Sequence, residues 1–165
     1  MRVFSALAAL LLTAAAPTAG SADIGDDFVR LERGHPSAAT MPAEARAVML
    51  YYGASWCGPC RAFVPELVAA YPELRRRGIE VVFISDDAGC EAAIDYARTS
   101  RMPWLLLPCR ARVRQHRLRA LGGKTLPGLV TVDPAGRVLA SSWHSNGDSV
   151  PRRALADVLF HHPAP

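Results

Sequence analysis

Two cysteines separated by two residues have a spacing that suits redox or metal chemistry. They are Cys57 and Cys60, with Trp56 directly before them and Gly58 and Pro59 between them. Such a pair can cycle between a dithiol and a disulfide, supply half of a four-ligand zinc site, or bind Cu(I). The spacing alone fits all three roles, so the elements that hold the two sulfur atoms have to distinguish them.

The pair follows a predicted buried strand and begins a predicted helix. The apolar run AVMLYY, residues 47–52, is short and is bounded by polar sequence and a glycine, which favours a buried strand. From Cys60 onward, apolar residues recur at three- and four-residue steps, which predicts a helix that is kinked at Pro65 and ends near Gly78. Cys57 would then lie at the helix N-terminus, where free N–H groups stabilise a thiolate, so we expect it to be the nucleophile. Cys60, one turn further on, would be the resolving thiol.

The rest of the chain alternates apolar runs of strand length with stretches of helical period. In chain order, the predicted elements are a strand over 79–85, a helix capped by Asp86 and Asp87, a strand over 102–108, an arginine-rich helix ending near Leu121, two strands around the turn DPAG, and a helix over about 150–160. Alternating strands and helices followed by an antiparallel pair predict an α/β fold, with a central mixed β-sheet and helices on both faces.

The first 22 residues have the pattern of a secretory signal peptide. Arg2 precedes an uncharged apolar run over 3–16, which suits a signal core and is shorter than the ~20 residues of a membrane span. Gly20 and Ala22 are small residues in the positions that predict cleavage after Ala22. We expect an exported, periplasmic or secreted protein, and the alternative is an uncleaved N-terminal anchor. The predicted organisation is a signal peptide over 1–22, a loose lead-in over 23–45 with one short element around residues 28–31, and a domain over 46–165.

Export makes the other two cysteines candidates for a second disulfide, because thiols tend to pair in an oxidising compartment. Cys90 and Cys109 follow two different predicted strands. If these strands are parallel, both cysteines lie at the carboxyl edge of the sheet, on the side of Cys57. Connectivity does not follow from cysteine number, so a disulfide between Cys90 and Cys109 is a hypothesis and two free thiols are the alternative.

The charge is modest and basic. The net charge is +4 at pH 7, and Lys124 is the only lysine among the basic residues. The arginines cluster at 75–77 and within 109–120, where exposed faces of amphipathic helices explain them. We expect no nucleic-acid partner, and we expect a monomer.

The motif WCGPC behind a strand, Pro65 in the following helix, and TLPGLVTVD downstream resemble the thioredoxin family. The stretches YYGASWCGPCRAFVPEL, IEVVFIS, MPWLLLP and DPAGRVL are similar to its tryparedoxin and nucleoredoxin branch and, more loosely, to exported TlpA-like thiol–disulfide reductases. The resemblance covers about residues 46–142 and implies the thioredoxin fold, with a cis peptide bond before Pro127. It also implies catalysis by Cys57 and Cys60 without a cofactor or a metal.

The same resemblance implies a substrate-binding surface. The backbone of Leu126, just before Pro127, would pair with an extended substrate strand. Trp56, together with Gly58 and Pro59, would shape the surface on which the substrate docks.

Three positions depart from the family pattern. Tyr51 stands where thioredoxins place a buried aspartate that helps to move the proton of the resolving cysteine. Gly128 replaces a usual threonine and Gly123 a common valine, so we expect a substrate groove of different shape.

Together these features predict an exported thiol–disulfide oxidoreductase that reduces protein disulfides. The Gly-Pro pair between the cysteines resembles that of reducing members of the family, and a reductase in an oxidising compartment would need a membrane-embedded dithiol electron donor. The alternatives are a thiol oxidase, a copper-binding chaperone of the same fold, and an interaction module with an inert disulfide. Structural zinc is disfavoured because Cys90 and Cys109 do not form a second CxxC pair.

Overall fold

Residues 24–161 are described in the computed structural model, apart from the side chains of residues 112–115. The predicted signal peptide lies outside the described residues. The strands are β1 (Phe28–Glu32), β2 (His35–Ala39), β3 (Ala47–Gly53), β4 (Ile79–Ser85), β5 (Leu105–Leu106), β6 (Gly128–Val132) and β7 (Val138–Ser141). The helices are α1 (Gly58–Arg76), α2 (Cys90–Thr99), α3 (Arg112–Arg119) and α4 (Pro151–His161).

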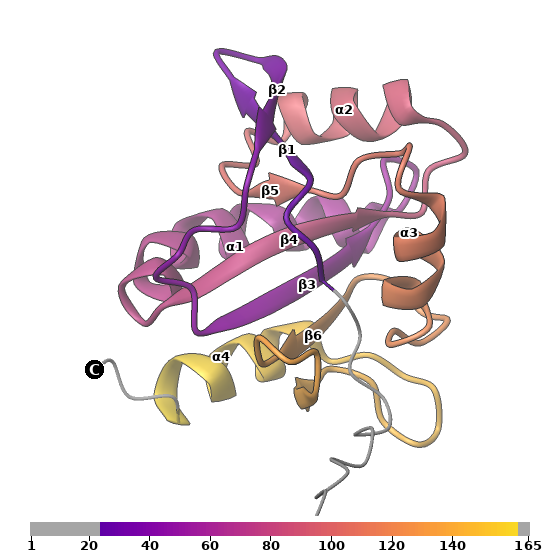
Figure 1. The fold of residues 1–165 in the computed structure, drawn as a ribbon. Coiled ribbons are helices and arrows are strands. Elements are labelled where there is room, and N and C mark those ends of the chain that lie inside the picture. Colours follow the sequence, from indigo (N-terminus) through magenta and orange to yellow (C-terminus); the bar gives the residue numbers. More distant parts are fainter. Residues whose placement is uncertain (1–23, 162–165) are drawn as a thin grey trace, which may run out of the picture.

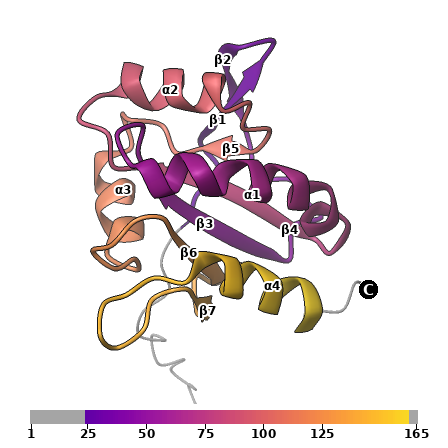
Figure 2. The same ribbon diagram turned by 180° about the vertical axis from the view of Figure 1, so that it is seen from behind.

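The strands form one mixed sheet in the order β2-β1-β5-β4-β3-β6-β7, as Figures 1 and 2 show from opposite sides. The neighbours β3, β4 and β5 are parallel, because α1 and α2 return the chain across the sheet between them. β6 runs antiparallel to β3, with Gly128 opposite Tyr52 and Val132 opposite Val48. The carboxyl end of β3 and the start of β6 therefore meet at the same edge of the sheet.

Side chains of the central strands alternate between two apolar cores, one on each face of the sheet. Met49 and Tyr51 of β3 face a core that also holds buried side chains of α1, α2 and α4. Leu50 and Tyr52 face the opposite core, where Leu118 of α3 packs. Because both faces are covered, every residue of β3 is buried, which explains its continuous apolar sequence. The predicted mixed sheet with helices on both faces is confirmed.

The short element expected around residues 28–31 is the strand β1, whereas β2 and the pairing of this segment with the sheet were not expected. β1 and β2 form an antiparallel hairpin, and Val29 of β1 pairs with Leu106 of β5, so the hairpin extends the sheet. Phe28 is fully buried in the core. The sequence HPSAA of β2 gave no strand pattern because β2 is an edge strand, where a proline is tolerated and most side chains are at least partly exposed.

Other boundaries differ only in detail. The helix after the cysteines begins at Gly58, two residues before Cys60, and continues through Pro65 to Arg76. β5 contains only Leu105 and Leu106 of the seven-residue run expected as a strand. None of the helices in the described part of the chain is long and apolar enough to cross a membrane.

A buried carboxylate joins three elements at the edge of the sheet away from the cysteines. Glu80, near the start of β4, is fully buried and accepts a hydrogen bond from the Tyr71 hydroxyl of α1 at 2.7 Å. Arg75 and Arg30 form ion pairs with the same carboxylate. The buried charge is therefore paired, as burial of an ionised group requires.

Candidate active site

Cys57 is the N-cap of α1, and Cys60 is in the first turn of that helix. The two residues form a disulfide with a Cα–Cα distance of 5.2 Å. The Sγ atom of Cys57 also accepts a hydrogen bond from the backbone N–H of Cys60 at 3.1 Å. Once the disulfide is reduced, this N–H group and the positive end of the helix dipole favour the thiolate of Cys57.

Exposure separates the roles of the two sulfur atoms. Cys57 keeps 5% of its surface accessible, whereas Cys60 has none. An attacking group from outside can therefore reach only Cys57. Cys60 can attack only a disulfide that Cys57 itself has formed, which is what a resolving thiol does.

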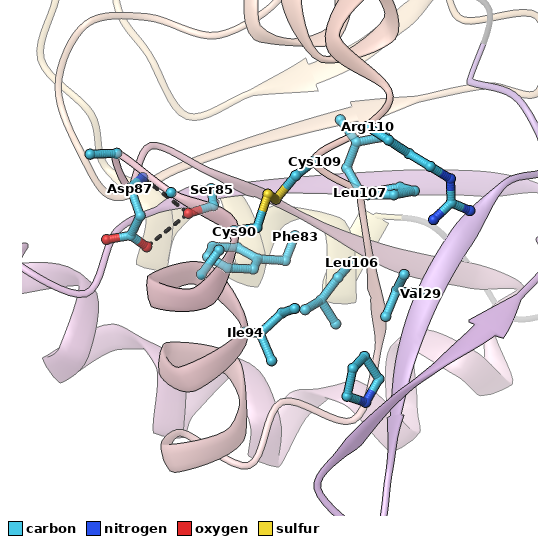
Figure 3. A pocket seen from close by; sticks show the side chains of 15 residues that line it. Val29, Phe83, Ser85, Asp87, Cys90, Ile94, Leu106, Leu107, Cys109 and Arg110 are labelled. Atoms are coloured by element: carbon cyan, nitrogen blue, oxygen red, sulfur yellow. Dashed lines mark hydrogen bonds between the residues drawn. A yellow bond between two sulfur atoms is a disulfide. The ribbon is translucent and has the colours of Figure 1, made fainter.

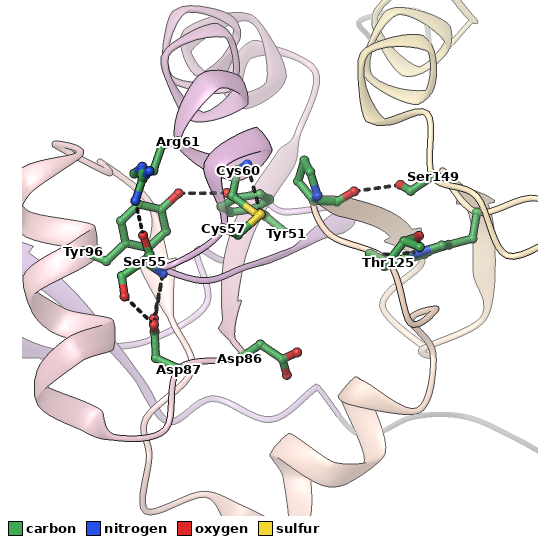
Figure 4. Close-up of a disulfide and its surroundings, with 12 residues drawn as sticks. Tyr51, Ser55, Cys57, Cys60, Arg61, Asp86, Asp87, Tyr96, Thr125 and Ser149 are labelled. Atoms are coloured by element: carbon green, nitrogen blue, oxygen red, sulfur yellow. Dashed lines mark hydrogen bonds between the residues drawn. A yellow bond between two sulfur atoms is a disulfide. The ribbon is translucent and has the colours of Figure 1, made fainter.

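The loop that carries Cys57 is tied to the end of the neighbouring strand through Asp87 (Figure 4). The Asp87 carboxylate accepts hydrogen bonds from the backbone N–H of Ser55 at 3.0 Å and from its hydroxyl at 2.7 Å. Ser85 donates to the other carboxylate oxygen at 2.8 Å. Arg61 of α1 donates to the Ser55 carbonyl oxygen at 2.9 Å. These contacts fix the segment between β3 and the first turn of α1.

Asp86 and Asp87 do not cap α2, contrary to the sequence-based expectation. The N-cap of α2 is Gly89, and it makes no side-chain capping hydrogen bond. Asp86 instead forms a two-point ion pair with Arg119 of α3, at 2.9 and 3.0 Å. The two aspartates lie in the turn before α2, from which Asp87 reaches the loop after β3 and Asp86 reaches α3.

Tyr51 occupies the place of the usual buried aspartate with a neutral side chain. It is fully buried, and its hydroxyl lies 3.4 Å from the hydroxyl of Tyr96 on α2, as Figure 4 shows. Burial, and then the neighbouring Tyr96, raises the pKa of Tyr51 far above its ordinary value. Tyr51 therefore remains a phenol at neutral pH and does not act there as the base that a carboxylate provides.

The predicted substrate-binding residues lie at the edge of the sheet where β3 ends. The Leu126–Pro127 peptide bond is cis, as the resemblance implies, and it directly precedes β6. Ser149 donates a hydrogen bond to the Pro127 carbonyl oxygen at 2.7 Å, while Leu126 is only partly buried. On the other side of the site, Trp56 is 64% exposed, and Gly58 and Pro59 are exposed on the first turn of α1.

Trp143, which sequence analysis did not identify, explains the two unusual glycines. Side chains at Gly123 and Gly128 would overlap the indole ring of Trp143. The indole N–H donates to the Thr125 carbonyl oxygen at 3.0 Å, and the ring packs edge-on against Tyr52 at 5.2 Å. The indole thus takes the space that larger side chains would fill in the loop before Pro127. The signal in the sequence was glycine at two positions where the family usually has larger residues, which indicates that another side chain fills the space.

Cys90 and Cys109 are also joined as a disulfide, with a Cα–Cα distance of 5.6 Å. Cys90 is the first residue of α2, and Cys109 lies in the connection between β5 and α3. No three His, Cys, Asp or Glu residues in the described part of the chain are grouped to hold a metal ion.

The comparisons with known proteins agree with this geometry. A sequence model of thioredoxin-like proteins matches residues 45–138, more than half of the chain. The chain belongs to the thioredoxin-like family. This thioredoxin-like chain is 40% identical to probable nucleoredoxin 1 of Arabidopsis thaliana over 114 residues, which are 68% of this chain and 19% of that protein.

Two solved tryparedoxins show the same fold. Tryparedoxin II from C. fasciculata is 31% identical and superposes with a TM-score of 0.60. The superposition covers 71% of this chain and 80% of the other. Tryparedoxin from Trypanosoma brucei is 27% identical, with a TM-score of 0.65 over 86% of this chain and 94% of the other. The thioredoxin-like chain spans about a fifth of the length of the nucleoredoxins that it matches. The expected tryparedoxin and nucleoredoxin branch is confirmed.

Proposed function

We propose that this protein is an exported thiol–disulfide oxidoreductase that reduces disulfides of other proteins. The observation that carries the proposal is the position of Cys57, whose Sγ atom caps α1 and accepts the N–H of Cys60 while Cys60 itself is buried. An inert structural disulfide needs neither this stabilisation of one sulfur nor this difference in access.

The reaction uses the two sulfur atoms in turn. The Cys57 thiolate attacks one sulfur of a substrate disulfide, forms a mixed disulfide, and releases the other substrate sulfur as a thiolate. The Cys60 thiolate then attacks Cys57 Sγ, breaks the mixed disulfide, and releases the second substrate thiolate. The substrate gains two electrons and the protein ends as the disulfide, so a dithiol donor must reduce it before the next cycle.

The protein's own groups bind and orient the substrate in this scheme. An extended substrate strand pairs with the backbone of Leu126, two residues before β6, at the edge of the sheet where β3 ends and the loop to Cys57 begins. The exposed indole of Trp56 supplies the apolar contact on the other side. Because Tyr51 stays protonated at neutral pH, the proton of the Cys60 thiol passes to water or to the departing substrate thiolate.

Export and the direction of electron flow rest on the sequence. The apolar run before Ala22 supports cleavage by a signal peptidase, and the Gly58-Pro59 pair resembles that of reducing family members. In an oxidising compartment, we propose a membrane-embedded dithiol carrier as the donor and a monomer as the working form. No observation favours copper binding over this function.

The test is the reduction potential of the Cys57–Cys60 pair. Thiol trapping in glutathione buffers should be done on the Cys90→Ser/Cys109→Ser variant, so that one disulfide is counted, and Cys60→Ser serves as the control that cannot form the pair. We expect a reduction potential of about −270 mV, as in reducing thioredoxins. A reduction potential of about −120 mV would make the protein a thiol oxidase instead. A pair that does not change redox state in the buffer range would contradict both redox functions.

A further inference from the structure

A cavity of ≈ 590 Å³ lies beside the Cys90–Cys109 disulfide, between α2, β5 and the N-terminal hairpin. This volume is in the range of sites that hold small organic molecules. Figure 3 shows the disulfide on its wall, with Phe83, Ile94 and Leu106 around the same space. The proposed reaction at Cys57 uses neither this disulfide nor this cavity.

The remaining wall is mainly apolar and carries little unpaired charge. Val29, Leu107 and Pro108 are among the other apolar residues of the lining. Arg110 also lines the cavity, but its guanidinium forms an ion pair with Asp27. The carboxylate of Asp87 is already hydrogen-bonded to Ser55 and Ser85. Since the charged groups already have partners, the lining suits a neutral, apolar occupant.

The two sulfur atoms of this disulfide are not equivalent. Cys90 is exposed and is the first residue of α2, a helix of ten residues, so its thiolate is stabilised by the helix N-terminus. Cys109 is partly buried on a loop that lines the cavity. Because the more stable thiolate leaves faster in disulfide exchange, a thiol arriving through the cavity would break the bond by attacking Cys109 and releasing Cys90.

We propose that the cavity binds a small apolar thiol, which exchanges with the Cys90–Cys109 disulfide and is held as a mixed disulfide on Cys109. The incoming thiolate forms a bond to Cys109 Sγ, the bond between the two protein sulfurs breaks, and the electron pair remains on Cys90 Sγ. The proton of the incoming thiol goes to solvent, and no other oxidant or reductant is needed. The reverse attack by the Cys90 thiolate restores the disulfide and releases the thiol.

The experiment compares an apolar with a polar thiol. The Cys57→Ser/Cys60→Ser variant isolates the second disulfide and is incubated with 2-phenylethanethiol or 2-mercaptoethanol, quenched with acid, and analysed by intact and peptide mass spectrometry. We expect equal adduct at an about tenfold lower concentration of 2-phenylethanethiol, because its ring leaves water for the apolar cavity. We also expect the adduct on Cys109.

Two further variants test the cavity itself. Ile94→Trp places an indole in the cavity and should abolish the preference for the apolar thiol while exchange with 2-mercaptoethanol continues. Val138→Trp adds an indole on the exposed strand β7 and should leave the preference unchanged.

Three results would overturn the proposal. They are a disulfide that reacts with neither thiol in the folded protein, equal adduct with both thiols at equal concentration, and attachment to Cys90. The thiol comparison does not depend on the folding of the cavity variants, so it decides the proposal alone.

Discussion

Trp143 and the two glycines beneath it form one packing unit at the scale of single residues. The indole overlaps the positions where side chains at residues 123 and 128 would begin, and its N–H holds the carbonyl of Thr125. The loop that carries Leu126, the residue proposed to pair with the substrate, is thus supported by a ring from the segment after β7 rather than by its own side chains. A larger residue and the indole should exclude each other.

This mutual exclusion can be measured by substituting Gly128 with threonine, the residue that the family usually has there. Gly128→Thr should lower the free energy of unfolding by about 2 kcal/mol, because the side chain overpacks against Trp143. In a Trp143→Ala background the same substitution should cost less than about 1 kcal/mol, since the space is then vacant. Urea denaturation of the four proteins gives the coupling energy. Gly89→Thr, at a glycine with open space around it, is the control, and additive effects of Gly128→Thr and Trp143→Ala would contradict the packing unit.

At the scale of elements, two adjacent aspartates connect loops with different consequences. Asp87 joins the turn before α2 to the segment that carries Cys57, through partly buried hydrogen bonds to Ser55 and Ser85. Asp86 joins the same turn to α3 through an ion pair with Arg119 that is open to solvent. The element that each side chain reaches, rather than the residue type, separates the two roles.

The comparison of the two aspartates is a direct test. Asp87→Ala should lower the free energy of unfolding by about 1–3 kcal/mol, because partly buried donors of Ser55 lose their acceptor. It should also reduce the rate of disulfide reduction by the protein, since the Cys57 loop loses its anchor. Asp86→Ala should cost at most about 1 kcal/mol and leave the rate unchanged, because exposed ion pairs contribute little. Equal effects of the two substitutions on rate would contradict the anchoring role of Asp87.

At the scale of the whole molecule, the two cores bury four tyrosines whose phenols must stay protonated. Burial raises the pKa of Tyr51, Tyr52, Tyr71 and Tyr96 above the ordinary value in each case. Tyr52 donates to the Leu118 carbonyl oxygen, and Tyr71 donates to Glu80. The folded state therefore holds these protons more tightly than the unfolded chain does.

Stability should consequently fall in alkaline solution. A raised folded-state pKa gives stability that is complete below the unfolded pKa of about 10 and is lost as the pH rises above it. Above that pH, each tyrosine should lower the free energy of unfolding by about 1.4 kcal/mol per pH unit. Urea denaturation between pH 7 and pH 11 measures this slope, and Tyr51→Phe should reduce it by about one tyrosine's share. A free energy of unfolding that stays constant up to pH 11 would disprove the prediction.

The local sequence determined the elements around Cys57. The uninterrupted apolar run of β3 and the helical period after Cys60 are local signals, because a strand buried on both faces and an amphipathic helix each need a particular pattern of side chains. The family motif added Pro127 and its cis bond. The second strand of the N-terminal hairpin, β2, was missed because an edge strand needs no apolar pattern. The pairing of β1 with β5 could not be predicted because β5 lies far along the chain.

Only the tertiary structure decided which side chains meet around those elements. The approach of Trp143 to Gly123 and Gly128, the hydrogen bonds from Ser55 to Asp87, and the contact of Tyr51 with Tyr96 all join residues distant in sequence. The same holds for the pairing of Cys90 with Cys109 and for the cavity beside them. Propensity and period act over a few residues, whereas these contacts depend on how the helices and loops pack against the completed sheet.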